Sequence, residues 1–170
     1  MATPKAYIHS QAKINDKLNV TFGYGCFVHP FAKISVEGGC TVNFGDYNII
    51  EENVVIRAYP KGKENFKMTI GNYNYFKSGC TLENTIVQNY NVFENKCKLT
   101  GSFVESGTII TPFVELKEGK TVKNNGIIFP QNKVMFNNYF DEEEFKKKMQ
   151  GEVSLLNQAM LSSTRQDKKK

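Results

Sequence analysis

The sequence predicts an all-β fold, a parallel β-helix of about six or seven coils that is followed by a C-terminal α-helix. Three observations predict it. Apolar residues recur every six positions, small residues stand four positions after them, and the period changes from six to helical after Pro130. A hexapeptide period is the signature of a β-helix, in which three hexads of strand and corner complete one triangular coil.

The first position of each hexad predicts the axial core. Aliphatic or aromatic residues occupy it in successive triplets, with a pair at each end: Ile8/Ile14, Phe22/Val28/Ile34, Phe44/Ile50/Ile56, Ile70/Phe76/Leu82, Val87/Phe93/Leu99, Val104/Ile110/Leu116 and Val122/Ile128. Stacked coils bury this position continuously along the axis.

The fifth hexad position also points inward, where the prism has room only for a small side chain. The residues found there are Ala12, Cys26, Ala32, Asn48, Val54, Asn74, Cys80, Asn91, Cys97 and Thr108. We expect the three asparagines to form an inward ladder. Four extra residues before Phe44, an excursion over 60–67 and short corners before Val87 and Val104 interrupt the period, as corner loops do in solenoids.

The segments GDYNI, GNYNY and QNYNV place Tyr47, Tyr73 and Tyr90 at the fourth position of one hexad in three successive coils. We expect these tyrosines to stack along one corner at about the 4.8 Å spacing of β-strands. Two interpretations stay open. The stripe is a partner interface, since tyrosine combines contact area with a polar tip, or it shields and stiffens the corner.

A helix is expected to begin at Asp141, which forms a capping box with Glu144, while Phe140 and Phe145 stand where a hydrophobic staple would put them. An apolar stripe then follows at spacings of three and four, made of Phe145, Met149, Val153, Leu156 and Met160. The stripe either packs back on the coils or is offered to another subunit. In the second case Phe145 and Met149 join the three tyrosines as candidate interface residues.

These patterns divide the chain into a solenoid over 1–136, a helix packing on or beside it over 137–162, and a disordered basic tail over 163–170. The 170 residues are 40% hydrophobic, which is enough for one core. The net charge of +5 does not collect into a basic stripe, so no nucleic-acid partner is expected. No stretch approaches 18 apolar residues and no apolar leader opens the chain, so neither a membrane span nor export is expected.

The four cysteines are expected to be reduced. Cys26, Cys80 and Cys97 take small inward positions, and Cys40 lies in a corner insertion. Buried free thiols of this kind are typical of cytoplasmic proteins.

The sequence contains few residues that could serve in catalysis. β-Helix acyltransferases use a histidine as general base, and carbonic-anhydrase-like β-helices use three histidines as zinc ligands. Only His9 and His29 exist here, and both are expected to be solvated residues near corners. On the carbonic-anhydrase-like pattern, the ligand positions fall on Ile56, Ser78 and Glu83.

The sequence therefore predicts no catalytic residue, no metal, no cofactor and no enzyme. The alternative is an acyltransferase-like or carbonic-anhydrase-like enzyme with a site formed between subunits.

One resemblance is specific. The run over 20–60, from VTFGYGCFVHPFAKISVEGG to FGDYNIIEENVVIRAYP, and the later MTIGNYNYFKSGC resemble the pointed-end family of dynactin subunit six, and the similarity extends over about 8–128. Departures are a shorter stretch between Ile14 and Phe22, a shorter loop over 60–67, and an end reading SSTRQ without a proline after Thr164.

The resemblance implies a left-handed coil and a non-enzymatic scaffold subunit of the dynactin pointed-end complex, supporting dynein-driven transport on microtubules. It also implies a cytoplasmic, cytoskeletal location. The partners it implies are dynactin subunit five, the pointed-end actin-related protein and subunit four, with dynein contacted indirectly.

Overall fold

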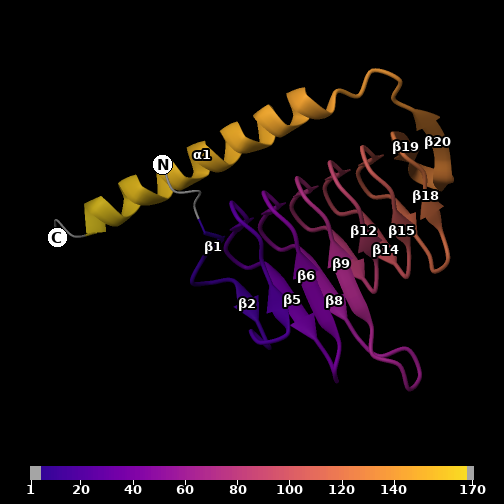
Figure 1. Ribbon diagram of the computed structural model, residues 1–170, viewed down its shortest axis with the longest axis horizontal. Coiled ribbons are helices and arrows are strands. Elements are labelled where there is room, and N and C mark those ends of the chain that lie inside the picture. Colours follow the sequence, from indigo (N-terminus) through magenta and orange to yellow (C-terminus); the bar gives the residue numbers. More distant parts are fainter. Residues whose placement is uncertain (1–4, 168–170) are drawn as a thin grey trace.

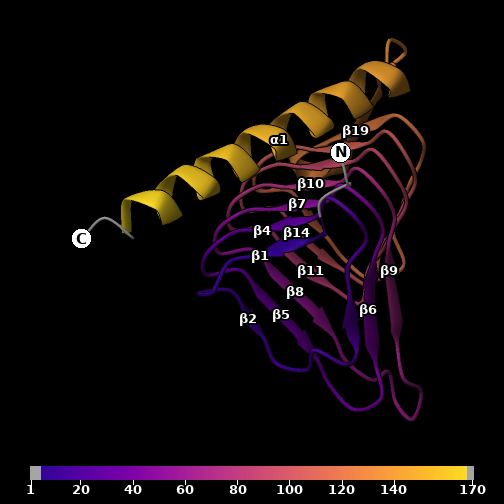
Figure 2. The same cartoon turned by 60° about the vertical axis from the view of Figure 1, so that its left-hand side comes forward.

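The computed structural model describes residues 5–167, with the side chains of residues 5–163. It is a left-handed parallel β-helix of about six coils followed by a C-terminal helix (Figure 1), as the sequence predicts. A view turned by 60° shows three sheets enclosing a triangular prism, with the helix lying along one side (Figure 2).

Each complete coil contributes one strand to each of the three sheets, and β20 is added antiparallel at the edge of the first sheet. The first sheet has eight strands in the order β1-β4-β7-β10-β13-β16-β19-β20: β1 (Tyr7–Ile8), β4 (Phe27–Val28), β7 (Ile49–Ile50), β10 (Tyr75–Phe76), β13 (Val92–Phe93), β16 (Ile109–Ile110), β19 (Gly126–Phe129) and β20 (Lys133–Phe136). The second sheet has six: β2 (Lys13–Ile14), β5 (Lys33–Val36), β8 (Val55–Ala58), β11 (Thr81–Glu83), β14 (Lys98–Thr100) and β17 (Glu115–Leu116). The third sheet also has six: β3 (Val20–Thr21), β6 (Thr41–Phe44), β9 (Lys67–Ile70), β12 (Ile86–Val87), β15 (Phe103–Val104) and β18 (Thr121–Val122).

Parallel pairing places each core residue beside its equivalent in the next coil. Val28 of β4, for example, is the partner of Ile50 of β7. All the predicted first-position residues from Val28 to Ile128 are buried. Ile8 is 41% exposed, because it belongs to the first coil and has a neighbouring coil on one side only.

The inward asparagine ladder is present. The Oδ1 atom of Asn48 accepts from the backbone N–H of Asn74 at 3.0 Å, and the Oδ1 atom of Asn74 accepts from that of Asn91 at 3.1 Å. Thr108 continues the ladder by donating its backbone N–H to Asn91 Oδ1 at 2.8 Å. These side chains are fully buried, and the ladder pairs their oxygens with backbone N–H groups of the next coil, while the Nδ2 atom of Asn91 has no hydrogen-bond partner among the described residues.

All four cysteines are free and buried. Cys40 lies in the corner between β5 and β6, as expected, and its side chain is buried in the core, where its Sγ accepts from the backbone N–H of Phe66 at 3.1 Å.

The segment after Pro130 differs from the expectation of a direct change to helical period. A short 3₁₀ turn, η1 (Pro130–Asn132), reverses the chain, and β20 then pairs antiparallel with β19. Gln131 and Asn132 make the reversal with φ of 64° and 58°. A four-residue strand is too short to show a period, so the sequence pattern did not reveal it.

The helix α1 (Glu142–Asp167) begins where the cap predicts, with the backbone N–H of Glu144 donating to Asp141 Oδ1 at 3.1 Å. It continues past the predicted end at 162 into the segment expected to be a disordered tail. No glycine or proline follows Gly151, so nothing in the sequence stops it. Residues 168–170 lie outside the described residues. Within the described part of the chain, no helix is both long and apolar enough to cross a membrane.

Candidate functional site

The three tyrosines of the repeated motif do stack along one corner. The ring centroids of Tyr47 and Tyr73 are 5.1 Å apart and those of Tyr73 and Tyr90 are 5.7 Å apart, with interplanar angles of 7° and 22°. Each tyrosine has a positive φ between 54° and 59°, which turns the chain at the corner.

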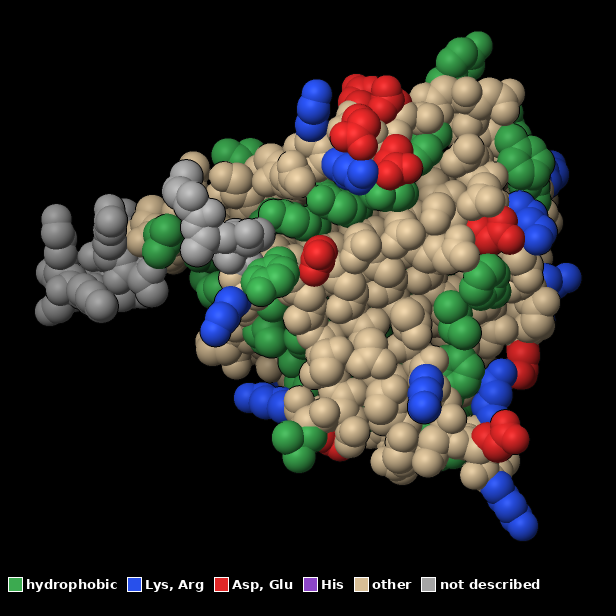
Figure 3. Space-filling view, in the orientation of Figure 1, with side chains coloured by type: hydrophobic (Ala, Val, Ile, Leu, Met, Phe, Trp, Pro, Cys, Tyr) green, Lys and Arg blue, Asp and Glu red, His purple; other side chains and the backbone are tan. Residues whose placement is uncertain are grey.

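The helix α1 packs against the outer face of the first sheet beside this stripe, and Figure 3 shows apolar side chains along the junction. Met149 and Val153 are buried against Ile49 of β7, with Phe145 and Leu156 partly buried around them. Gln150 donates its Nε2 to the Tyr73 hydroxyl at 3.1 Å.

Tyr90 is the last of the three stacked tyrosines and lies beside the first turn of α1. Its hydroxyl donates to Glu142 Oε1 at 2.7 Å, and burial, reinforced by that carboxylate, raises the pKa of the phenol. The five candidate interface residues, Tyr47, Tyr73, Tyr90, Phe145 and Met149, therefore lie together in a contact within the chain. A role for them in binding another protein stays a prediction.

Beside the stripe, α1 and the first sheet enclose a groove of about 480 Å³. Val92 and Ile109 are among the sheet residues that line it, and Phe145 and Lys148 line it from the helix. Tyr75 also lines it, and its hydroxyl donates to Glu51 Oε1 at 2.6 Å. Tyr75 thus stands between the groove and the corner that follows β7, and neither Glu51 nor Glu52 lines the groove.

At that corner, His29 and Glu52 are in contact. The Nδ1 atom of His29 is 3.1 Å from Glu52 Oε1. The His29 side chain is only 16% exposed, and its ring packs edge-on against Phe27 at 5.0 Å. His29 was expected to be a solvated residue, and this expectation is wrong. The sixfold register pairs Val28 with Ile50 and so places His29 beside Glu51, whereas the contact is with Glu52, one residue further along the corner; the period alone therefore does not reveal it.

The contact defines the chemistry of the imidazole. A carboxylate beside Nδ1 favours the tautomer with the proton on that nitrogen, which leaves Nε2 free as a base. Burial raises the pKa of Glu52, but its own backbone N–H and the His29 ring outweigh this, so the pKa lies below its ordinary value. Glu52 is therefore charged at neutral pH and can accept a hydrogen bond from His29 Nδ1.

Two other ionisable side chains, Glu51 and His9, are engaged in hydrogen bonds to backbone N–H groups. Glu51 Oε2 accepts from the Ser78 backbone N–H at 2.8 Å and from its hydroxyl at 3.0 Å. His9 Nδ1 accepts from the backbone N–H of Gln11 at 3.1 Å, which makes it part of a turn. His29 is thus the histidine with a carboxylate partner.

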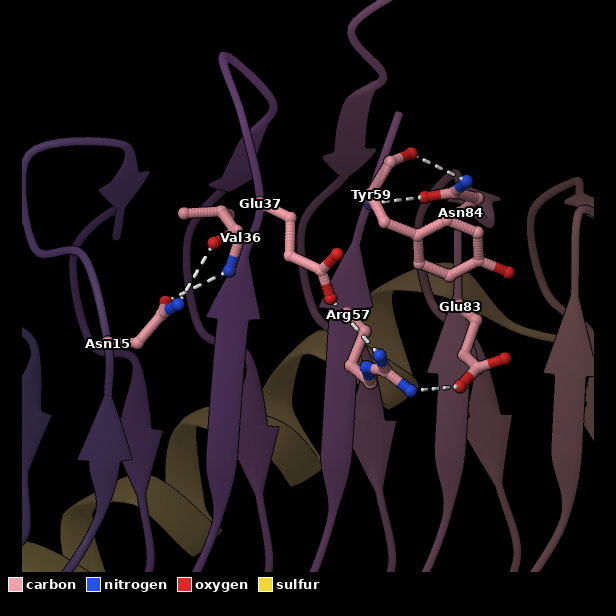
Figure 4. A network of polar contacts seen from close by, with 7 residues as sticks. All are labelled: Asn15, Val36, Glu37, Arg57, Tyr59, Glu83 and Asn84. Carbon is pink, nitrogen blue, oxygen red and sulfur yellow. Dashed lines mark hydrogen bonds and ion pairs between the residues drawn. The ribbon is translucent and has the colours of Figure 1, made fainter. Parts of the chain in front are cut away.

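The three positions that correspond to zinc ligands have other roles. Ile56 is fully buried in the core, and Ser78 binds Glu51. Glu83 Oε1 accepts from Arg57 Nη1 at 3.1 Å, and the other end of the same guanidinium binds Glu37 (Figure 4). Among the described residues, no three His, Cys, Asp or Glu side chains are grouped to hold a metal. The donor set does not suit the carbonic-anhydrase-like alternative.

Near these residues, the side chains of Asn15 and Asn84 each pair with the backbone of a residue in a neighbouring coil. Asn84 accepts from the backbone N–H of Tyr59 and donates to its carbonyl, both at 2.9 Å, and Asn15 does the same with Val36 (Figure 4). These contacts continue the strand pairing between coils and have an architectural role.

No protein-family model matches the chain, and no curated protein matches its sequence. Among solved structures, a predicted acetyltransferase from Bacillus cereus aligns with 17% identity over 89% of this chain and 87% of that chain, with a TM-score of 0.58. A hexapeptide transferase family protein from Anaplasma phagocytophilum aligns with 17% identity over 88% of this chain and 90% of that chain, with a TM-score of 0.47. The first of these likenesses establishes a shared hexapeptide-repeat fold.

These neighbours correct two linked predictions. The protein was expected not to be an enzyme and to be a scaffold subunit of dynactin; both expectations are contradicted, since the solved structure that shares its fold over most of both chains is described as an acetyltransferase. The expected dynactin partners and cytoskeletal location depended on that assignment, and no other observation supports them. The coarser part of the resemblance, a left-handed hexapeptide-repeat β-helix, is confirmed.

Proposed function

We propose that the protein is an acyltransferase, with His29 as the general base and Glu52 as the residue that positions it. The observation that carries the proposal is the contact of His29 Nδ1 with Glu52 Oε1 at 3.1 Å. It supplies a half-buried imidazole with its second nitrogen free, which is the group that proton abstraction from an acceptor requires. The fold shared with an acetyltransferase supports the reaction class by analogy.

In the proposed reaction, an amine or hydroxyl of the acceptor attacks the carbonyl carbon of an acyl thioester. Nε2 of His29 takes the proton of the attacking group as the new C–N or C–O bond forms. The C–S bond then breaks, and the departing thiolate receives that proton from the imidazolium, which restores neutral His29. Glu52 stabilises the imidazolium while it exists.

We place the substrates partly between two copies of the chain. Glu52 is 43% exposed at its side chain, so a single chain leaves this corner open to water. A neighbouring subunit would cover the corner and supply donors for the developing oxyanion.

The test incubates the full-length protein with acetyl coenzyme A and a panel of amines and alcohols, and measures released coenzyme A and acetylated product by mass spectrometry. His29→Asn should lower kcat by about 10²- to 10⁴-fold, the usual contribution of a general base. Glu52→Gln should have a smaller effect and should shift the pH dependence of kcat. His9→Asn is the matched control and should be unchanged.

Full activity in His29→Asn would refute the assignment of the base. An absence of both turnover across the panel and calorimetric binding of acetyl coenzyme A would refute the acyltransferase proposal.

A further inference from the structure

The strand β20 forms the outer edge of the first sheet, at the end of the stack far from β1 (Figure 1). Its three apolar residues are more than half exposed: Val134 by 52%, Met135 by 61% and Phe136 by 57%. Figure 3 shows apolar side chains at this end of the molecule. Within residues 5–167, no strand pairs with the free edge of β20. An exposed apolar edge strand is a template for pairing with another chain.

The register shows which backbone groups face that free edge. The N–H of Asn137 donates to the Asn125 carbonyl at 2.8 Å, in the register that places Phe136 opposite Gly126. Hydrogen-bonded pairs alternate along an antiparallel ladder, so Met135 and Lys133 bond to β19. Val134 and Phe136 therefore point their N–H and C=O groups outward.

An independent contact gives the same result. The carbonyl of Ile128 in β19 accepts from the backbone N–H of Thr111, which lies on the β16 side, at 3.0 Å. Ile128 therefore turns its backbone away from β20, and its partner Val134 has no ladder bond to it.

The side chains of the edge are also incompletely covered. Val134 lies opposite Ile128, a core residue, so Val134 and Phe136 point to the core side of the sheet. No further coil follows β20 among the described residues, and this apolar face therefore stays half exposed.

We propose that β20 pairs antiparallel with β20 of a second copy, about a two-fold axis through Met135. In this register Val134 faces the partner's Phe136, so both outward-pointing residues exchange hydrogen bonds with the partner. Lys133 faces the partner's Asn137, and like charges are not opposed. The two first sheets join into one continuous sheet, and the coil stacks meet end to end.

A second copy suits this edge because the pairing is self-complementary. Both Val134 and Phe136 carry a donor and an acceptor, and a two-fold axis matches each to the other. The edge is also far in strand order from His29, which follows β4 near the other end of the sheet. The pairing at β20 is therefore a different contact from the one proposed over the His29 corner, and each can be tested separately.

The test uses light scattering after size exclusion on the full-length protein. Met135 faces its own copy across the axis, so Met135→Glu and Met135→Lys each place like charges in contact. Each variant alone should have half the assembled mass of the wild type. An equal mixture of the two should recover the wild-type mass, because the opposed charges then attract.

A second pair of variants tests the backbone contact. Val134→Pro removes an N–H that points outward and leaves the ladder to β19 intact, as proline does on an edge strand. It should also halve the mass, whereas Val134→Thr keeps the N–H and should not. Circular dichroism checks that each variant is folded.

A wild type that stays monomeric up to about 100 μM, where even weak specific contacts form, would overturn the proposal. So would an assembly that Met135→Glu leaves intact, or a mixture of charge variants that does not reassemble.

Discussion

At the residue scale, the repeated motif of glycine, aspartate or asparagine, tyrosine and asparagine reflects contacts between equivalent residues of successive coils. Asp46 Oδ1 accepts from the backbone N–H of Tyr24 at 2.8 Å, and Asn72 Oδ1 accepts from that of Asp46 at 2.7 Å. The glycine is required by the close approach, since a Cβ on Gly71 would lie 2.6 Å from the Gln88 carbonyl oxygen. The Asp or Asn recurs because its side chain accepts a hydrogen bond from the backbone of the equivalent residue in the preceding coil.

The inward ladder gives the first stability prediction. Asn74 Nδ2 donates to Asn48 Oδ1 at 3.1 Å and to the Gln88 carbonyl at 2.9 Å, and its Oδ1 accepts from Asn91. Asn74→Ala leaves buried polar groups unpaired, which costs about 1 to 3 kcal/mol each. Urea unfolding should show this loss, whereas Asn138→Ala, at an exposed turn, should change stability by no more than about 0.5 kcal/mol. Equal effects of the two would contradict the ladder's role.

The buried thiols give a pH prediction. Burial raises the pKa of Cys26 from 9.0 to about 11. The unfolded chain loses this proton at lower pH than the folded chain does, so the contribution of Cys26 to stability should decrease as the pH rises from 9 to 11. In Cys26→Ala this part of the pH dependence should disappear from denaturant midpoints measured across that range. An unchanged slope would show that other groups cause it.

The same burial predicts slow thiol chemistry. Contact with Cys80, at 3.4 Å between the sulfur atoms, and burial raise the pKa of Cys97. At pH 8, a thiol-specific reagent should therefore modify the native protein far more slowly than the denatured protein, in which all four cysteines react. Rapid native labelling of any one of them would mean that its coil opens.

At the scale of elements, α1 shows that a stripe of apolar residues can be predicted while its partner cannot. The spacing of Phe145, Met149 and Val153 predicts one buried face. The structure adds that this face covers Ile49 and the tyrosine corner. The sequence could not choose between this contact and another subunit, because both bury the same side chains.

This contact can be tested with two residues of one helix. Met149 is 1% exposed and Leu155 is 64% exposed. Met149→Ala should lower the free energy of unfolding by about 2 to 5 kcal/mol, through lost burial and the cavity left behind. Leu155→Ala should stay within about 0.5 kcal/mol. If thermal melts of the two variants coincide, α1 is not packed on the first sheet in solution.

At the scale of the whole molecule, stability depends on every coil keeping the same register. One alanine inserted between Asn91 and Val92 would turn Val92 inward and Phe93 outward and would misalign the later strands. We expect this insertion to abolish cooperative thermal unfolding, followed by circular dichroism.

The matched control is a Gly-Ser insertion after Gly62. This residue lies in the loop where Lys61 and Glu64 form an isolated bridge, and a Cβ there would meet nothing within 4 Å. Lengthening such a loop costs little entropy, so the melting temperature should change little. Comparable damage from both insertions would mean that the loop, too, is part of the packed structure.

The coil, its core and its asparagine ladder could all be predicted from the sequence. These features repeat, and each depends on a neighbour one coil away, so a fixed period of side-chain types is enough to reveal them. The same regularity explains the mistaken assignment to dynactin. A hexad pattern is required by any core of this shape and carries little information about a functional site.

The tertiary structure alone decided the features that occur once: the return of β20 along β19, the sheet face that α1 covers, and the contact of His29 with Glu52. None of them repeats along the chain. Each depends on where a turn or a helix brings non-equivalent residues together, and a contact of that kind leaves no period in the sequence.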